Sequence, residues 1–314
     1  MSGPGRNRNR RSNSDGGGSS GGRGRSGATG GRQARSGGRG RGGGSGAGRG
    51  QSRDGTQPQP NRKRTQGLGG DQVEGRQAVR ELLLAGRRRT KQVLIADETD
   101  NAEVLTDIAE LARDLDVPFR TVARKRLAAE AATTAHQGVI AQAAPLPEAD
   151  VDDLMADPRA FLLVLDGITD PGNLGALLRT AECAGVTGVI LPRHRAVHIS
   201  PTVTKTAAGA VEHLDLAVVG GIPAALQALS GAGVTTIGLD AGGEASIFEA
   251  LTMADGPIAL VLGAEGRGLS RLVRQRVDQL VAIPLAGGLN SLNVAAAAAI
   301  ACFEVVRRRN PVSQ

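Results

Sequence analysis

Hydrophobic residues in the C-terminal part of the chain form short runs that alternate with amphipathic segments. Residues 161–165 read Phe-Leu-Leu-Val-Leu, a continuous apolar run typical of a strand that is buried on both faces. Similar runs predict strands over 188–191, 214–219, 235–239, 258–262 and 280–283, with helices over 174–184 and 200–208 among them. Strands that alternate with helices predict an α/β fold with a mainly parallel, doubly wound sheet, here over residues 161–309.

A smaller α/β domain is predicted over residues 71–144. Apolar residues at helical spacing predict helices over 73–84, which Gly86 can end, and over 104–115. Shorter apolar runs over 92–95, 117–122 and 138–142 predict strands. Two prolines and several acidic residues follow, and they predict a linker over 145–160.

Residues 1–70 differ in composition from the rest of the chain. They hold 24 of the 46 glycines, and their 14 arginines and one lysine stand against two acids, so the segment carries +13 and the remainder −6 of a net +7. Its few apolar residues cannot bury enough surface to offset chain entropy, so we predict a disordered tail. Repeated Gly-Arg units attract phosphate without reading sequence, so weak RNA binding and an inert solubilising extension both remain open.

The composition excludes several classes of protein. Two cysteines, Cys183 and Cys302, are too few for a disulfide scaffold or a zinc site, and they indicate a reducing cytoplasm. The most apolar stretch, 294–306, is rich in alanine and contains Glu304, so it predicts a buried helix rather than a membrane span. The arginine-rich start lacks the apolar core of a secretory signal. We therefore expect a cytoplasmic protein without a membrane segment or a metal site.

Three loops after predicted strands form the candidate site, because ligands of doubly wound sheets bind beyond the carboxyl ends of the strands. The first loop contains Asn173 and leads to Arg179. A separation of six residues is about 600° of helical rotation, so the two side chains do not share a helix face and Asn173 must act from the loop or cap. The alternatives are a plain N-cap for Asn173 and a solvated surface residue for Arg179.

The second and third loops are rich in glycine and in polar side chains. Three glycines over 262–269 let a backbone approach a ligand closely, but their spacing is not that of a dinucleotide loop, and the lysine of a P-loop is missing. Glu265 in this loop would repel phosphate but can face a hydroxyl or a cation; an ordinary tight turn is the alternative. Asn290, Ser291 and Asn293 in the third loop are more polar groups than one helix cap requires.

Together the three segments resemble the signature motifs of the SpoU/TrmH family, within the SPOUT superfamily of methyltransferases. The motifs read Asn-x-Gly-x-x-x-Arg-x-Ala over 173–181, Gly-Ala-Glu-Gly-x-Gly over 263–268, and Ile-Pro at 283–284 followed by Ser-Leu-Asn-Val over 291–294. The resemblance covers about residues 161–309. The segments 166–173 and 136–139 are similar to the branch that methylates a guanosine 2′-hydroxyl in 23S rRNA.

This resemblance implies a fold and a cofactor that periodicity cannot show. The family has a deep C-terminal trefoil knot, binds S-adenosyl-L-methionine in the knot without a metal, and forms homodimers whose catalytic residues come from both subunits. By resemblance, the cofactor contacts Gly263, Ile283 and Leu292. Residues 71–144 correspond to an RNA-binding domain in the 23S rRNA branch.

The resemblance also assigns the catalytic residues. Arg179 is assigned to the reacting hydroxyl, but arginine resists deprotonation, so we interpret it as binding the adjacent phosphate and stabilising the developing alkoxide, with base action left open. Asn173 and Asn293 are expected to orient Arg179 and the ribose. Glu265 would hold a loop or the arginine, and Ser291 is the remaining polar group within reach of the hydroxyl.

Two other functions remain as alternatives. The first is 2′-O-methylation of tRNA ribose; a folded domain over 71–144, in place of basic helical extensions, favours rRNA. The second is an RNA-binding ribosome-assembly factor without catalysis, which the basic tail fits equally well. A factor of that kind does not require polar residues in all three loops.

Overall fold

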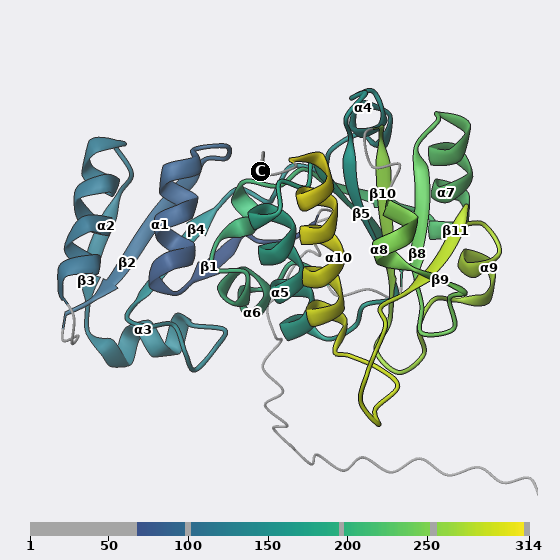
Figure 1. Ribbon diagram of the computed structural model, residues 1–314. Helices are drawn as coiled ribbons and strands as arrows, with labels where there is room; N and C mark the ends of the chain where they lie inside the picture. Colours follow the sequence, from purple (N-terminus) through teal and green to yellow (C-terminus); the bar gives the residue numbers. More distant parts are fainter. Residues whose placement is uncertain (1–67, 98–101, 195–197, 252–255, 311–314) are drawn as a thin grey trace, which may run out of the picture. The chain divides into compact units, whose positions relative to one another are not determined.

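The computed structural model describes residues 68–97, 102–194, 198–251 and 256–310 (Figure 1). The predicted disorder of residues 1–67 lies outside these ranges. Leu68 is buried in a hydrophobic cluster, and Gly69 forms a β-bridge with Ile199. The packed part of the chain therefore includes residues that the sequence places in the tail.

The N-terminal part of the described chain forms a four-stranded sheet in the order β1-β4-β2-β3. Its elements are β1 (Gln72–Glu74), α1 (Arg76–Ala85), β2 (Thr90–Ala96), α2 (Ala102–Asp114), β3 (Phe119–Val122), α3 (Arg124–Glu130) and β4 (Val139–Ala143). Helices α1 and α2 pack together on one face of this sheet, and α3 packs on the other.

Two elements of this smaller sheet differ from the sequence prediction. The helix predicted over 73–84 begins only at Arg76, because Gly75 has a φ of 97° and separates it from β1. Gly86 ends the helix in the left-handed conformation, as predicted. Helix α3 was not predicted, since Leu127 is its one buried residue and leaves no apolar periodicity to detect.

The larger sheet has seven strands in the order β7-β6-β5-β10-β8-β11-β9, and all its pairs are parallel. The strands are β5 (Phe161–Asp166), β6 (Gly188–Pro192), β7 (Leu216–Val219), β8 (Thr235–Leu239), β9 (Ala245–Ser246), β10 (Ile258–Gly263) and β11 (Gln279–Ala282). The helical segments are α4 (Val151–Met155), α5 (Pro171–Cys183), α6 (Pro201–Thr206), the 3₁₀ turn η1 (Ala210–Glu212), α7 (Ile222–Gly231), α8 (Ile247–Ala250), α9 (Arg271–Arg274) and α10 (Val294–Arg309). The predicted α/β class with a mainly parallel sheet is confirmed.

Hydrophobic clusters cover both faces of this sheet. In β5, Phe161, Leu163 and Leu165 join a cluster with α5 and α10, while Leu162 and Val164 join a second cluster with α7. The strand is therefore buried on both faces, as its apolar run predicts. Helix α10 stands beside α5 (Figure 1), with which it makes many contacts.

The segment 145–160, predicted as a linker, is packed against the larger sheet. It contains α4, whose N-cap Asp150 accepts a hydrogen bond from the Asp152 amide. Leu146 and Leu154 are both buried in hydrophobic clusters. Prolines and acidic residues do not identify a linker by themselves. Acidic residues also cap short helices, and prolines also occur in the turns between short elements.

A buried ion pair, Arg88–Glu212, connects the smaller sheet to the rest of the described chain. The side chains of Arg88 and Glu212 are 3% and 1% exposed. The Arg88 guanidinium donates to both Glu212 carboxylate oxygens, at 2.8 and 2.6 Å, and to the carbonyls of Gly70 and Ala144. Gly70 and Ala144 lie where the chain enters and leaves the smaller sheet, so one side chain holds both connections.

Two features are absent from the ranges that the structure describes. None of the helices there combines the length and the apolar character that crossing a bilayer requires. The same ranges contain no group of three or more His, Cys, Asp or Glu side chains that could hold a metal ion.

Candidate active site

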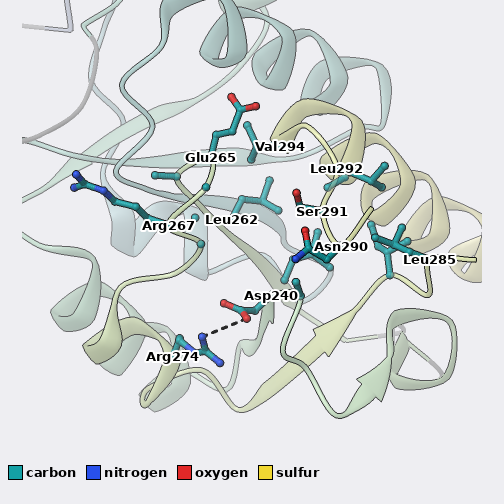
Figure 2. Close-up of a pocket in the computed structure, with 18 residues that line it drawn as sticks. Asp240, Leu262, Glu265, Arg267, Arg274, Leu285, Asn290, Ser291, Leu292 and Val294 are labelled. Atoms are coloured by element: carbon teal, nitrogen blue, oxygen red, sulfur yellow. Dashed lines mark ion pairs between the residues drawn. The ribbon is translucent and has the colours of Figure 1, made fainter. Parts of the chain in front are cut away.

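A cavity of about 340 Å³ lies at the carboxyl ends of the strands, between the loops after β8, β10 and β11 (Figure 2). The predicted cofactor residues Gly263, Ile283 and Leu292 all line it, and so do Glu265 and Ser291. The strand order brings these loops together, because β10 pairs with β8 and β8 pairs with β11. Two of the three motif segments therefore form the cavity walls.

The loop after β10 is a tight turn that a backbone hydrogen bond closes. The Gly268 amide donates to the Ala264 carbonyl at 2.8 Å, and Gly266 and Gly268 have φ angles of 75° and 63°. A Cβ atom on Gly263 would lie 2.1 Å from the carbonyl carbon of Gly268. Only glycine fits at position 263, so the backbone itself forms this wall of the cavity.

Hydrogen bonds join one residue from each of the three motifs. The Asn173 amide donates to the Glu265 carboxylate at 2.9 Å, and the Asn293 amide donates to the Asn173 carbonyl oxygen at 2.9 Å. The Asn293 oxygen in turn accepts from the Ala295 amide at the start of α10. Three residues separated by up to 120 positions thus form one connected polar chain beside the cavity.

The cap of α5 decides between the two readings of Asn173. Asp170 is the N-cap, since its carboxylate accepts a hydrogen bond from the Asn173 backbone amide at 2.7 Å. Asn173 itself is the third residue of α5, so it acts from the first helical turn and not from the loop or cap as predicted. Its side chain is free of capping and bonds to Glu265 and Asn293, so the plain N-cap alternative is wrong. Asn293, in contrast, caps α10 and bonds to Asn173 at the same time.

Arg179 lies apart from this polar chain. It is exposed on α5, about 9 Å along the helix axis from Asn173. In the described parts of the chain, no hydrogen bond or ion pair holds its guanidinium. The expectation that Glu265 or the asparagines hold Arg179 is not met within one subunit.

An ion pair in the cavity wall was missed by the sequence analysis. Asp240 follows β8, and its carboxylate lies 3.3 Å from the Arg274 guanidinium, as Figure 2 shows. Asp240 also accepts from the Gly242 amide at 2.9 Å. Its position directly after a strand was the available signal, because the same rule selected the other loops.

The two cysteine thiols of the chain, Cys183 and Cys302, are unsuited to nucleophilic chemistry. Burial raises the pKa of Cys302 in α10 to about 12, and burial followed by a hydrogen bond with Glu182 raises the pKa of Cys183. Both thiols are therefore protonated at neutral pH, and neither is the thiolate that nucleophilic attack requires. At the end of α10, a hydrogen bond from Arg307 is the main cause that lowers the pKa of Glu304 to about 2.

The cavity suits the expected cofactor in size and chemistry. Its volume lies within the range of about 300–1,000 Å³ that is common for small-molecule sites. Apolar side chains such as Leu262 and Ile283 can contact a purine ring, and backbone groups beside Gly263 can bond to it. Glu265 and Arg267 place opposite charges at the cavity, which suits a ligand that carries both a cation and a carboxylate.

Comparisons with known proteins agree with these features. The family model described as the SpoU rRNA methylase family matches residues 160–303, and one described as RNA 2′-O ribose methyltransferase substrate binding matches residues 72–149. A Bacillus subtilis protein assigned to the TrmH family of tRNA/rRNA methyltransferases is 38% identical, over 78% of this chain and 98% of its own length. The 23S rRNA guanosine-2′-O-methyltransferase of Photobacterium profundum is 37% identical, over 77% of this chain and 99% of its own length.

A solved structure has the same fold and a bound cofactor. The SpoU methyltransferase AviRb from Streptomyces viridochromogenes, crystallised with S-adenosylmethionine, superimposes with a TM-score of 0.64. It is 25% identical, and the superposition covers 76% of this chain and 90% of that one.

Proposed function

Since the chain belongs to the SpoU family of RNA methyltransferases, we propose that it transfers a methyl group from S-adenosyl-L-methionine to the 2′-hydroxyl of a guanosine in 23S rRNA. The observation that carries the proposal is the polar chain Glu265–Asn173–Asn293, which lies beside a cavity suited to the cofactor. A non-catalytic assembly factor would not require these three side chains to meet.

The chemistry divides between the cofactor and the protein. When bound, S-adenosylmethionine supplies a methyl group on a sulfonium, a leaving group that needs no further activation. The protein must align the ribose hydroxyl with that methyl group and assist the loss of its proton. Because a ribose hydroxyl is a very weak acid, stabilising the alkoxide as it forms is the demanding part of the task.

We assign the roles of the site residues on this basis. Gly263, Ile283 and Leu292 hold the cofactor. Glu265 fixes Asn173, and Asn173 with Asn293 presents amide groups toward the ribose. The exposed Arg179 acts on the RNA side, where its guanidinium binds a phosphate and the developing alkoxide.

Ser291 completes the set as a hydroxyl in the cavity wall. We assign it as a further polar group within reach of the ribose hydroxyl. This assignment requires no metal, because the methyl donor already carries its leaving group.

The path of the chain supports the family's trefoil knot. Strand β11 pairs with β8 and β9, whereas α10 contacts α5 and β10 on the other side of β8. The segment 283–293 must therefore cross the carboxyl ends of β8 and β10, where the other cavity loops lie. We propose that the segment passes beneath those loops, as the family's knot requires.

An exposed apolar face on α10 supports a homodimer. Ile300 and Phe303 are 37% and 48% exposed although they lie three residues apart on one side of the helix. Leu289 in the preceding segment is 82% exposed. A second copy packed on this face would bury these side chains and bring a second α5 near the cavity, which would supply an Arg179 to the polar chain.

The substrate domain and the cellular site follow from the same proposal. Residues 71–144 would bind the RNA, as the substrate-binding family model suggests. An enzyme that acts on 23S rRNA works in the cytoplasm. Methylation of tRNA is kept as an outcome of the test rather than as a second proposal.

Two measurements test the function. Ribose-methylation mapping of total RNA from cells with and without the protein should show one 23S rRNA guanosine that loses its methyl group. Purified protein should transfer tritium from labelled S-adenosylmethionine to 23S rRNA or its precursor particles. Label on tRNA alone would overturn the rRNA assignment, and no label on any RNA would overturn the enzyme assignment.

Replacing Gly263 with alanine should weaken cofactor binding. Because the added Cβ would meet backbone at 2.1 Å, the loop must move and the cavity wall with it. We expect the affinity for S-adenosylmethionine, measured by calorimetry, to fall by about 10²-fold, the cost typical of a misplaced site. Gly287→Ala is the matched control, since nothing lies within 4 Å of its Cβ position. Equal affinities in the two variants would contradict the assigned cofactor site.

Deleting residues 1–66 should weaken RNA binding without affecting cofactor binding. The tail has a net charge of +13 whereas the remainder of the chain carries −6, so counterion release makes the tail's contribution largest at low salt. We expect the difference in RNA affinity to be about tenfold at about 50 mM salt and to vanish at several hundred millimolar. Identical salt titrations for the full and shortened chains would support the inert extension instead.

A further inference from the structure

A row of glutamines crosses one end of the smaller sheet. Gln142 of β4 lies directly opposite Gln72 of β1 on one side and Gln92 of β2 on the other. We call these three residues the amide row. All three side chains are half-buried, and they lie on the face of the sheet that carries α3, since Val73, Val93 and Ala141 belong to the cluster on the opposite face.

Helix α3 packs on the other end of this face and reaches the amide row only at its C-terminus, where the Glu130 carbonyl accepts from Gln72. Its Leu127 packs on Leu94, Ala96 and Ile140, which are later residues of β2 and the start of β4. Figure 1 shows α3 running below α1 and α2 rather than across the whole sheet. The amide row is left at the end of the sheet that joins the rest of the chain, two residues from Gly70 and two from Ala144.

The amide row keeps unused hydrogen-bonding groups. Gln92 donates to the Gln142 oxygen at 3.0 Å, and Gln72 donates to Glu74 and to the Glu130 carbonyl. Within the described chain, nothing accepts from the Gln142 amide nitrogen, and nothing donates to the side-chain oxygens of Gln72 and Gln92. The α3 face of the sheet thus presents one free donor, on Gln142, between two free acceptors, on Gln72 and Gln92.

Basic side chains on the α3 face contrast with the acidic helix α2 on the other face. Arg120 points to the same face as the amide row, because it lies opposite Leu94, and Arg124 and Lys125 begin α3. No carboxylate in the described ranges pairs with these three side chains, which we call the basic rim. Helix α2, on the other face, carries Glu103, Asp107, Glu110 and Asp114 with one arginine.

We infer that the amide row and the basic rim are the surface on which this domain reads an unpaired RNA loop. The basic rim binds phosphates and fixes the position of the strand, while the amides bond to the edges of splayed bases. Amides are suited to this task because each presents a donor and an acceptor together. With no Trp, no Tyr and four Phe in the chain, stacking on aromatic rings is scarce, so hydrogen bonds must carry the selection. The acidic α2 face would repel the same strand.

This inference rests on the proposed function, which requires an RNA substrate, and it names the surface that the RNA contacts. It is tested on the full chain with 23S rRNA transcript as the probe. Gln92→Met together with Gln142→Met keeps the side-chain volume but removes two amides. We expect KM for the transcript to rise about tenfold, with kcat, cofactor affinity and the melting temperature little changed. Discrimination against transcripts with altered bases at the methylated loop should fall as well.

A matched pair of charge variants tests which face of the smaller sheet binds the RNA. Arg120→Gln and Arg113→Gln each remove one positive charge, from the basic rim and from α2 respectively. Arg120→Gln should weaken RNA binding uniformly across sequences and lower the salt slope by about one, whereas Arg113→Gln should leave both unchanged. The inference is overturned if the two arginine variants behave alike, or if the double methionine variant binds and methylates RNA normally. In either case the proposed function is judged separately, by whether the unaltered protein methylates 23S rRNA.

Discussion

Replacing Arg179 with alanine will abolish most methyl transfer and leave cofactor binding intact. The residue is exposed on α5 and is not among those that line the cavity, so its loss does not disturb the cofactor. Removing one donor that stabilises a developing oxyanion costs about 10²–10³-fold in kcat. Tritium transfer measures the first effect, and calorimetry with S-adenosylmethionine measures the second. Near-normal turnover would remove Arg179 from the mechanism.

Arg179→Lys is the matched variant, because it keeps the charge but not the planar fork of donors. If Arg179 binds phosphate and alkoxide together, lysine should restore only a small part of the activity. Full activity with lysine would reduce the role of Arg179 to charge alone.

The place of Arg179 in a dimer can be tested with two inactive variants. Asn173→Ala removes the centre of the polar chain but keeps the α5 cap, which Asp170 provides. If Arg179 serves the partner's cavity, a mixed dimer of Arg179→Ala and Asn173→Ala subunits has one intact site. Such dimers, purified through two different tags, should recover about half of the wild-type activity. No recovery would place Arg179 and Asn173 in the same subunit's site.

Replacing Glu212 with alanine will strongly destabilise the protein. The substitution leaves the buried Arg88 guanidinium without its carboxylate, and a buried charge that loses its partner costs about 3–5 kcal/mol. The midpoint of urea unfolding should fall accordingly. RNA methylation should fall further than cofactor binding in the folded fraction, because Arg88 also holds the two chain connections at Gly70 and Ala144.

Two controls separate the buried pair from charge in general. Asp215→Ala breaks the nearby ion pair with Arg87, whose side chains are 39% and 45% exposed, and should cost less than about 1 kcal/mol. Replacing Arg88 and Glu212 together with methionine and leucine should recover most of the lost stability, since no charge is then left buried. Equal losses for Glu212→Ala and Asp215→Ala would show that burial does not govern the effect.

The strands and the motif residues could be read from the sequence alone. The runs over 161–165 and 258–262 identify β5 and β10 because strands buried on both faces must be apolar throughout. Asn173, Glu265 and Asn293 were selected because polar residues in loops after such strands have no packing role. The glycine at 263 was marked by its spacing, and the close approach to Gly268 is the physical reason for it.

Other features depended on contacts between residues far apart in the chain. The N-cap of α5 belongs to Asp170 and not to Asn173, a choice between neighbours that only hydrogen-bond geometry decides. The Arg88–Glu212 pair joins residues 124 positions apart, and the amide row joins three strands that are neighbours in the sheet but not consecutive in the sequence. Local periodicity reports which face of one element is buried, but it carries no information on which element lies beside it. The order and register of the strands decided which polar groups meet, and the tertiary structure alone supplies that order.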